Sequence, residues 1–413
     1  WTRFLAAFDA RQRSLMRYVA SKSSARLKPA VDTLLAVYAS PDSLSRLSLS
    51  PQDPYAADIL SHGLVHLSRY NAEKALAQWQ GYNTRFTFNA QQQRDVEHAI
   101  AQRLLFARSD SSREWLHAVL ERLQDDTLVG IRLRWALAEQ DWAGFERALS
   151  LLSKEERQDT VWRYWSSVAL AQRGATDAAR ELLKAVARER DYYGFLAADK
   201  LGEPYAFNHR PLERADTSSL RELPALQRIE ELHFHEEALL AQSEWYKVLS
   251  DTADTATQQQ LALLASDQGW YRMAIDAATR AQAWDALEVR FPTPYRSVFD
   301  ASAAAQQVPG TELMAIARRE SAFFPQARSP VGALGLMQVM PATGAQVASS
   351  LGQRHSNADL LQVEHNVLLA STYYRQLLDR FNGNRVLALT AYNAGPHRVD
   401  RWRNKPQDAV SVE

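Results

Sequence analysis

The sequence predicts an all-α protein in which a long array of paired helices precedes a smaller helical set and a third helical domain. From Trp1 to about Tyr192 the chain is rich in Ala, Leu, Gln and Arg, and its apolar residues recur at helical spacing. Gly and Pro are scarce there, and the alternation that marks β-strands is missing. An internal period in the same region indicates that the helices repeat in pairs.

This period is 33 residues long. Ala136–Ala138 recurs as Ala169–Ala171, Leu149 recurs as Leu182, and a polar turn follows each Ala-Leu-Ala segment. A helix pair repeated at this length resembles a tetratricopeptide unit, and such units stack into a superhelix. The segment 65–79 is typical of an earlier pair that has drifted in length. We therefore predict a superhelical, tetratricopeptide-like array.

Two proline-containing linkers divide the rest of the chain. Turns at Gly202–Pro204 and Arg210–Pro211 end the array, and Arg290–Tyr295 forms the second linker. The helical pattern between them is short and includes one segment that resembles the second helix of a repeat. We predict an α-superhelical domain at 1–210, a small helical linker domain at 211–290, and a third α-domain at 291–413.

The composition excludes several classes of function. The 413 residues carry 48 basic and 48 acidic side chains, so there is no electrostatic basis for binding nucleic acid or an acidic membrane surface. There are no cysteines, which excludes disulfides, thiol chemistry and zinc-thiolate sites. No stretch has the length and apolarity of a membrane-spanning helix. We therefore expect no nucleic-acid partner and no integral membrane segment.

The main functional signal begins with a helix that follows Pro309, a residue suited to a first helical turn. Leu313, Ile316 and Ala317 set its apolar face, and the next position at that spacing is Glu320. Burial disfavours the charged form of a carboxyl and raises its pKa, which a general acid requires. The alternative is a glutamate at the helix end that faces solvent or pairs with a neighbouring arginine.

An uncharged segment, residues 329–353, follows this helix. Gly332 and Gly335 allow the backbone to approach other backbone or a ligand closely. Gln338 is an uncharged donor and acceptor within an apolar run, and Met337 and Met340 flank it. The segment contains four glycines and two prolines, so it is no membrane helix.

A later helix ends in Ala391-Tyr-Asn-Ala-Gly-Pro396, a Gly-Pro stop that leaves Tyr392 and Asn393 at its C-terminal end. Glu320-Ser321, the Ser329-Pro-Val-Gly-Ala-Leu-Gly-Leu-Met-Gln block and this segment resemble the three signatures of soluble lytic transglycosylases. Those are bacterial enzymes that cleave the glycan of peptidoglycan. Each signature alone has little specificity, whereas three in order at family-like spacing are highly specific.

The resemblance implies a lysozyme-like α-domain, covering about Ser297 to the end, behind a ring- or horseshoe-shaped superhelix. It also implies peptidoglycan glycan strands as the substrate, the periplasm as the location, and no cofactor or metal. The chain begins at Trp1 without Met, so we expect a signal peptide that was removed or never included. The family continues past its Val412–Glu413 pair into a segment with a second acidic cleft residue, which this sequence does not include. Protein partners in wall synthesis are not identified.

The resemblance also assigns roles to individual residues. Glu320 is the catalytic acid and base, and the substrate-binding candidates are Ser329, Gln338, Met340, Tyr392 and Asn393. Ser329 lies where family members place a hydrogen-bonding serine, and Tyr392 supplies an uncharged phenol to orient the sugar. Asn393 either binds sugar hydroxyls or caps its helix. Ser321 has a structural role.

Ordinary glycosidases use two carboxylates, whereas no Asp or Glu lies between Glu320 and Asp359. One acid is sufficient if the substrate supplies the nucleophile. The resemblance implies that Glu320 protonates the glycosidic oxygen after N-acetylmuramic acid and then deprotonates the C6 hydroxyl of that sugar. Ring closure gives a 1,6-anhydro end without water, and the acetamido group stabilises the reacting carbon.

Two other functions stay open from the sequence. A goose-type lysozyme-like muramidase shares the single glutamate and adds water, although the long helical array argues against it. A wall-binding scaffold without catalysis would not need Glu320, Gln338 and Tyr392 together. A metal site at His233-Phe-His235 is disfavoured, because residues two apart on a helix point in different directions.

Overall fold

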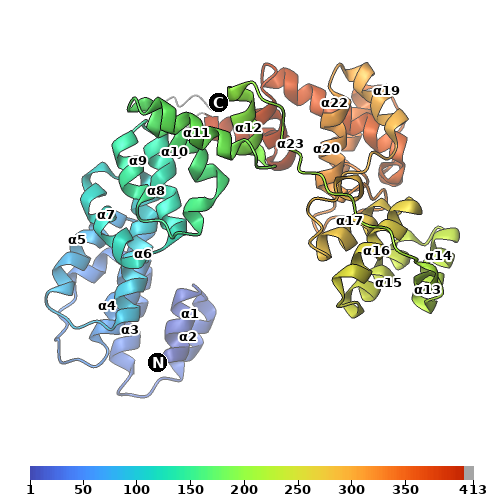
Figure 1. Cartoon of the computed structure of the whole chain (residues 1–413). Helices are drawn as coiled ribbons and strands as arrows, with labels where there is room; N and C mark the ends of the chain where they lie inside the picture. The colour runs from blue at the N-terminus through green and yellow to red at the C-terminus, as the bar shows by residue number, and fades with distance from the viewer. Residues whose placement is uncertain (404–413) are drawn as a thin grey trace. The chain divides into compact units, whose positions relative to one another are not determined.

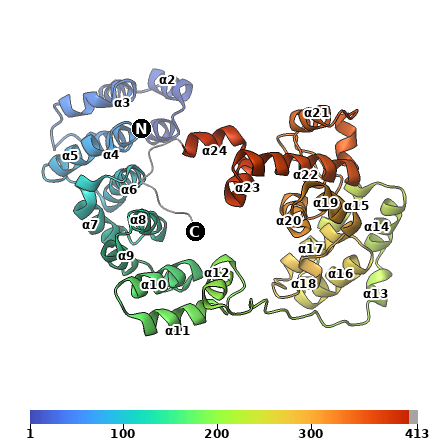
Figure 2. The same ribbon diagram turned by 90° about the horizontal axis from the view of Figure 1, so that it is seen from above.

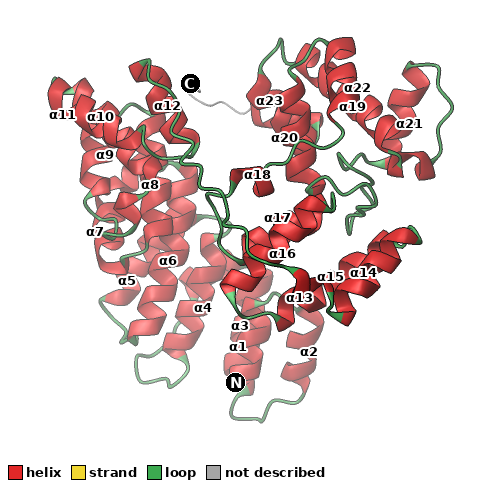
Figure 3. Cartoon of the chain, turned by 45° about the vertical axis from the view of Figure 1, so that its right-hand side comes forward, coloured by secondary structure: helices red, strands yellow, loops and turns green. Residues whose placement is uncertain are grey.

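The structure is a computed structural model that describes residues 1–403. In that range the chain forms α-helices and short 3-10 helices and no β-strand, as Figure 3 shows. Its β-type pairing there is limited to isolated bridges that join Leu334 to Arg328 and to Val339. The predicted all-α class is therefore confirmed. Val412 and Glu413 lie outside the described residues.

The chain forms two compact units, residues 1–207 and the described part that begins at 208 (Figure 1). The first unit contains paired helices that follow one another in chain order (Figure 2). Its elements are α1 (Thr2–Asp9), α2 (Arg13–Ser21), α3 (Lys28–Ala39), η1 (Pro41–Arg46), α4 (Ala56–Ser68), α5 (Ala72–Asn83), α6 (Ala90–Ala107), η2 (Asp110–Ser112), α7 (Arg113–Leu123), α8 (Asp126–Ala138), α9 (Trp142–Leu149), η3 (Glu156–Gln158), α10 (Thr160–Gln172), α11 (Thr176–Val186) and α12 (Tyr192–Leu201).

The repeat in the amino-acid sequence corresponds to two consecutive helix pairs. Helices α8 and α9 begin at 126 and 142, and α10 and α11 begin at 160 and 176. The structural repeat is thus one residue longer than the 33-residue period of the letters. Local chemistry starts the first pair, because Asp125 and Asp141 accept hydrogen bonds from N–H groups three residues on.

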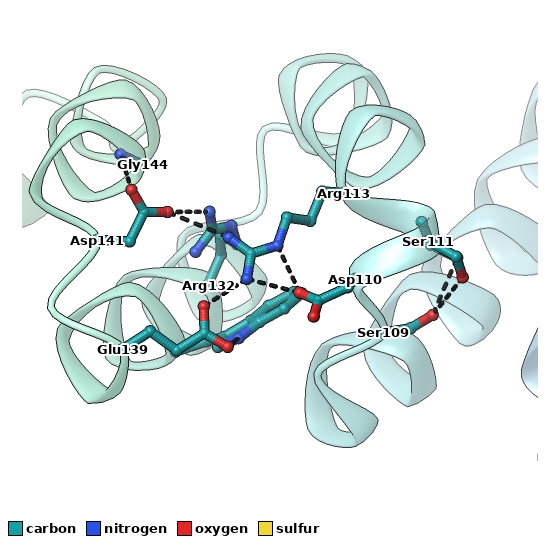
Figure 4. A network of polar contacts seen from close by, with 10 residues as sticks. Ser109, Asp110, Ser111, Arg113, Arg132, Glu139, Asp141 and Gly144 are labelled. Carbon is teal, nitrogen blue, oxygen red and sulfur yellow. Dashed lines mark hydrogen bonds and ion pairs between the residues drawn. The ribbon is translucent and has the colours of Figure 1, made fainter. Parts of the chain in front are cut away.

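A polar network fixes the α7, α8 and α9 helices relative to one another (Figure 4). Arg113 pairs with Glu139 and Asp141, and Arg132 also pairs with Asp141. The two guanidinium groups lie 4.7 and 4.8 Å from the ring centroid of Trp135, which is buried. Two cations over one indole stabilise its packing. Trp135 therefore belongs to the core of the helix pairs and is not an exposed sugar platform.

The second unit carries the candidate site. Its elements are α13 (Ser218–Arg221), α14 (Pro224–Phe234), α15 (Ala238–Asp251), α16 (Thr255–Asp267), α17 (Tyr271–Arg280), α18 (Leu287–Arg290), α19 (Arg296–Gln306), α20 (Gly310–Ser321), α21 (Pro341–Ser350), η4 (Asn357–Leu361), α22 (Val363–Arg380), α23 (Arg385–Ala394) and α24 (Pro396–Arg403). Two hydrophobic cores occupy it, one built from α14 to α18 and one from α19 to α24 with Ile275 of α17. The predicted division into three domains, with a boundary near 290, stays a prediction.

The core built from α19 to α24 lies between the helices that carry the candidate site. Helix α22 runs against α19, α21 and α23 and supplies several fully buried residues, including Val367 and Tyr374. Helix α20 contributes Leu313 and Ala317 to the same core. No helix within residues 1–403 is both long and apolar enough to cross a bilayer.

Candidate active site

Glu320 occupies the last turn of α20, on the face that Leu313, Ile316 and Ala317 turn to the core. Those three residues are buried and Glu320 is half-buried. The helix ends at Ser321, because Ala322 and Phe323 adopt a left-handed backbone with φ of 53° and 63°. The chain therefore turns sharply next to the carboxyl.

Burial raises the pKa of Glu320, and the nearby positive charge of Arg319 opposes the shift only in part. Neither Arg318 nor Arg319 forms an ion pair with Glu320 in the described part of the chain. Arg318 instead donates from Nε to the backbone carbonyl of Arg290, at 2.7 Å. Within residues 1–403, Glu320 is thus not paired with a neighbouring arginine, which was the alternative from the sequence.

Ser321 holds the end of α20 in place, in agreement with the structural role expected for it. The residue is buried, and its hydroxyl donates to the carbonyl of Leu336 at 2.6 Å. The same oxygen accepts from the N–H of Phe324 at 3.0 Å. Arg272 of α17 donates to the Ser321 carbonyl at 3.1 Å. The position of the carboxyl next to Ser321 is therefore tied to the glycine-containing loop.

That loop, residues 327–340, consists of two tight turns. The first spans 329–333, where Ser329 N–H donates to the Ala333 carbonyl and Ala333 N–H donates back to the Ser329 hydroxyl, at 2.9 and 2.8 Å. The second spans 335–338 between Leu334 and Val339, which exchange two backbone hydrogen bonds of 3.0 Å. Ser329 thus stabilises a turn, and its hydroxyl hydrogen stays available to donate.

The two glycines of the loop serve different needs. Gly335 has φ of +78°, and a Cβ there would lie 1.9 Å from the carbonyl oxygen of Leu360 and 2.4 Å from Nδ2 of Asn366. Close approach of backbone is therefore required at Gly335. Gly332 has φ of +93° with nothing within 4 Å of an added Cβ, so the turn geometry alone favours glycine there.

Asn366 of α22 holds this loop from behind. It is completely buried, and its Nδ2 donates to the carbonyls of Leu334 and Leu360 at 3.0 and 2.8 Å. Its Oδ1 accepts from the N–H of Met337 at 2.8 Å. The Asn366 amide thus makes three hydrogen bonds, two to the loop and one to η4. Sequence reasoning missed Asn366, although a polar residue on the apolar face of a helix is a visible signal.

Gln338 is half-buried and its side chain bonds within the loop. Its Nε2 donates to the carbonyls of Gly335 and Ala327, at 2.8 and 3.2 Å. Its backbone adopts φ of 51°, which completes the second turn. Only the Oε1 atom is therefore left for a ligand. Met340 lies two residues on, is 41% exposed and presents a flexible apolar side chain at the surface.

Tyr392 is brought to the same place from α23. Its hydroxyl donates to the carbonyl of Met337 at 2.8 Å, which connects α23 to the loop that Asn366 holds. Burial raises the pKa of Tyr392, and the Glu320 carboxylate raises it further. The phenol therefore stays protonated and lies within electrostatic range of the proposed acid.

Two further residues, Tyr373 and Asn393, lie next to Tyr392 in space or in sequence. The ring of Tyr373 from α22 lies 5.7 Å from the ring of Tyr392, and burial raises its pKa as well. Its hydroxyl has no hydrogen-bond partner in residues 1–403, and the sequence analysis did not single it out. Asn393 is exposed and has no side-chain partner in that range, so nothing there shows a capping role.

The structure thus places Glu320, Gln338 and Tyr392 around one loop, with Met340 exposed at its end. Ser329 lies in the first turn of the same loop. A cavity of about 490 Å³ also borders α20, and its lining includes Thr311, Met314 and Arg318. At helical spacing these three residues point away from Glu320.

An array of helix pairs, followed by a helical core in which the half-buried Glu320 lies within electrostatic range of Tyr392, defines an all-α protein with a candidate acid site. Comparisons with known proteins agree. Residues 297–411 match the model of the transglycosylase SLT domain, and residues 219–287 match that of the soluble lytic murein transglycosylase L domain. Residues 219–287 and 297–411 therefore belong to domain families of lytic murein transglycosylases.

Relatives include the soluble lytic murein transglycosylase of Escherichia coli K12, which is 32% identical over 339 residues, 81% of this chain and 52% of that protein. The enzyme of the same description from Salmonella typhimurium is 33% identical over 317 residues, 76% of this chain and 49% of that protein. The chain therefore spans about half the length of the curated relatives it matches.

Two solved structures are similar over nearly the whole chain. A lytic transglycosylase of Pseudomonas aeruginosa, solved as an inactive Glu→Gln mutant, has a TM-score of 0.84 at 32% identity and covers 98% of this chain and 66% of its own. The 70-kDa soluble lytic transglycosylase of Escherichia coli has a TM-score of 0.83 at 28% identity, with 97% and 65% covered. Both support the superhelical and lysozyme-like architecture.

Proposed function

We propose that this protein is a peptidoglycan lytic transglycosylase of the bacterial periplasm. It cleaves the β-1,4 bond between N-acetylmuramic acid and N-acetylglucosamine and leaves a 1,6-anhydro end. The observation that carries the proposal is Glu320, a half-buried carboxyl whose pKa is raised by burial, on a helix tied to an uncharged loop. The names of the relatives support murein as the substrate, and one related structure is a complex with bulgecin A.

The first step needs a proton on the leaving oxygen. Glu320 begins protonated, because burial disfavours its carboxylate. It protonates the glycosidic oxygen while the bond to the anomeric carbon of N-acetylmuramic acid breaks. The acetamido group of that sugar stabilises the cationic carbon. The loop at residues 327–340 contains no acidic residue, so it supplies no second carboxylate for this step.

The second step returns the same residue to its starting state. The Glu320 carboxylate accepts the proton of the C6 hydroxyl as that oxygen bonds to the anomeric carbon. A well-aligned intramolecular group reaches an effective molarity on the order of 10⁵ M or more, compared with about 55 M for water. Ring closure therefore outcompetes hydrolysis wherever the hydroxyl is held in place. Gln338 Oε1, Met340 and Ser329 are the candidates for holding the glycan.

Replacing Tyr392 with Phe is expected to reduce turnover about tenfold and to change glycan affinity by less than about twofold, a difference of about 1.4 kcal/mol in the transition state. The variant loses the hydroxyl that donates to Met337 and lies close to the Glu320 charge. Steady-state turnover of purified sacculi, together with a glycan-binding assay, measures both. Tyr373→Phe is the matched control, because its hydroxyl has no partner within residues 1–403. Equal turnover of both variants and the parent would reduce Tyr392 to a packing residue.

The pH dependence follows from the direction of the Glu320 shift. The pKa is raised, so the active protonated form persists above the ordinary range of a carboxyl, about 4.3, and is lost as the pH rises through the folded pKa. The same shift makes stability relative to the unfolded chain greatest below the ordinary pKa and lower above the raised one. We expect kcat/KM to fall on the alkaline side while circular dichroism stays unchanged. Constant activity up to strongly alkaline pH would mean that the acid is not a carboxyl.

The product distinguishes this proposal from hydrolysis. Mass analysis of products from sacculi is expected to show muropeptides lighter by one water than muramidase products, with no reducing muramic acid end. Mainly reducing ends would favour a lysozyme-like muramidase. No cleavage by folded protein, with retained binding, would favour a catalytically silent wall-binding scaffold. No specific observation favours the muramidase or the wall-binding scaffold over the transglycosylase.

A further inference from the structure

Three potential metal ligands meet at a place that the proposed reaction does not use. His355 lies in the loop after α21, Asp359 in η4 and His365 in the first turn of α22. One ligand atom from each lies within 4.8 Å of the others, and all three residues are half-buried. Within residues 1–403 this is the one group of three such side chains. Sequence reasoning considered only His233 and His235.

The two imidazoles face each other directly. Nδ1 of His355 lies 3.1 Å from Nε2 of His365, and the rings are nearly parallel, at 9°. The other nitrogen of His355, Nε2, is buried beside Gly344 and has no hydrogen-bond partner in the described range. Nδ1 is therefore the atom that His355 offers to a ligand.

The carboxylate of the group is already held in place. Oδ2 of Asp359 accepts from the N–H and the hydroxyl of Ser356, at 2.7 and 2.9 Å. Carboxylates that bind metals are commonly oriented by such hydrogen bonds. Asp359 thus keeps its other oxygen available, on a short 3-10 helix that begins directly after Ser356.

We propose that His355, Asp359 and His365 form a binding site for a divalent transition metal ion of the Zn²⁺ type. Two imidazoles and a carboxylate are a ligand set of three-ligand zinc sites, in which water completes the coordination. In a tetrahedral site with Zn–N distances of about 2.0–2.1 Å, two nitrogens are about 3.3 Å apart. The observed separation of 3.1 Å is close to this value.

Such an ion would strengthen the support of the loop beside Glu320. It would join η4 to the first turn of α22, one residue before Asn366. Asn366 donates to Leu360 of η4 and holds Leu334 and Met337 of the loop. Metal binding therefore stabilises a wall of the candidate active site without contributing a group to the reaction. This role is independent of the proposed activity.

Calorimetric titration with Zn²⁺ alone tests the site, using the full chain after dialysis against a chelator and then chelator-free buffer at pH 7.5. The parent is expected to bind one Zn²⁺ per chain. His365→Gln and Asp359→Asn are each expected to weaken binding at least tenfold. His397→Gln is the matched control, because His397 is exposed on α24 and outside the group. It is expected to bind like the parent.

Two further measurements keep the result independent of folding and of activity. Zn²⁺ is expected to raise the Tm of the parent and of the His397→Gln variant by several degrees and to leave His365→Gln unchanged. Co²⁺ bound at the site is expected to give visible absorption that the His365→Gln variant lacks, with circular dichroism confirming that this variant is folded. A parent that binds no Zn²⁺, or an ion retained by both His365→Gln and Asp359→Asn, would overturn the proposal and leave a proton shared by two histidines.

Discussion

Replacing Glu320 with Gln is expected to reduce turnover of peptidoglycan by a factor on the order of 10³ or more and to leave the fold and glycan binding intact. General acid–base catalysis typically contributes about 10² to 10⁴, and here one residue serves both steps. The amide keeps the shape of the side chain and cannot transfer the proton. Glu320 makes no hydrogen bond within residues 1–403, so its replacement removes no hydrogen bond there.

Glu312 provides a matched control on the same helix. It is half-buried like Glu320, but it pairs with Arg385 and accepts from the hydroxyl of Tyr374 at 2.8 Å. Glu312→Gln should therefore lower thermal stability and keep turnover within about tenfold of the parent. Release of soluble muropeptides from sacculi, with Tm measured on the same samples, separates the two effects. Turnover of Glu320→Gln within tenfold of the parent would refute Glu320 as the acid.

The elements of the fold were predictable because their causes are local. The helical period and the Gly-Pro stop after Ala394 depend on residues that are close in sequence. The position of Glu320 on the apolar face of α20 follows from the same spacing, and its raised pKa follows from that face being buried. The spacing between helix pairs was wrong by one residue. Matching residues can recur after 33 positions even though the helices themselves begin 34 positions apart.

The support of the site was not predictable, because it depends on contacts between distant segments. Asn366 and Met337 are 29 residues apart, and Tyr392 and Met337 are 55 apart. No local pattern announces that these groups share one loop. Gln338 shows the limit most clearly: its neutral amide was a sound candidate for binding sugar, yet its Nε2 bonds to the loop itself. Its role toward the glycan stays a prediction that concerns Oε1.

Replacing Asn366 with Ala is expected to lower the free energy of unfolding by about 3–5 kcal/mol. Each buried polar group that loses its partner costs about 1–3 kcal/mol. This substitution strands the carbonyl of Leu360 and the N–H of Met337, and it removes one of the two hydrogen bonds that the carbonyl of Leu334 accepts. Urea unfolding of the full chain measures the loss. Asn393→Ala is the matched control, because Asn393 is exposed and surface substitutions usually change stability by less than about 0.5 kcal/mol.

The same substitution should also reduce turnover at temperatures where the variant is folded. Asn366 fixes Met337, and the carbonyl of Met337 is the acceptor for the hydroxyl of Tyr392. A loop released from α22 would therefore let the phenol move away from the Glu320 side. An Asn366→Ala protein as stable as the Asn393→Ala protein would contradict the buried network. Normal turnover in a clearly destabilised protein would instead show that Tyr392 is held by packing, with the loop free to shift.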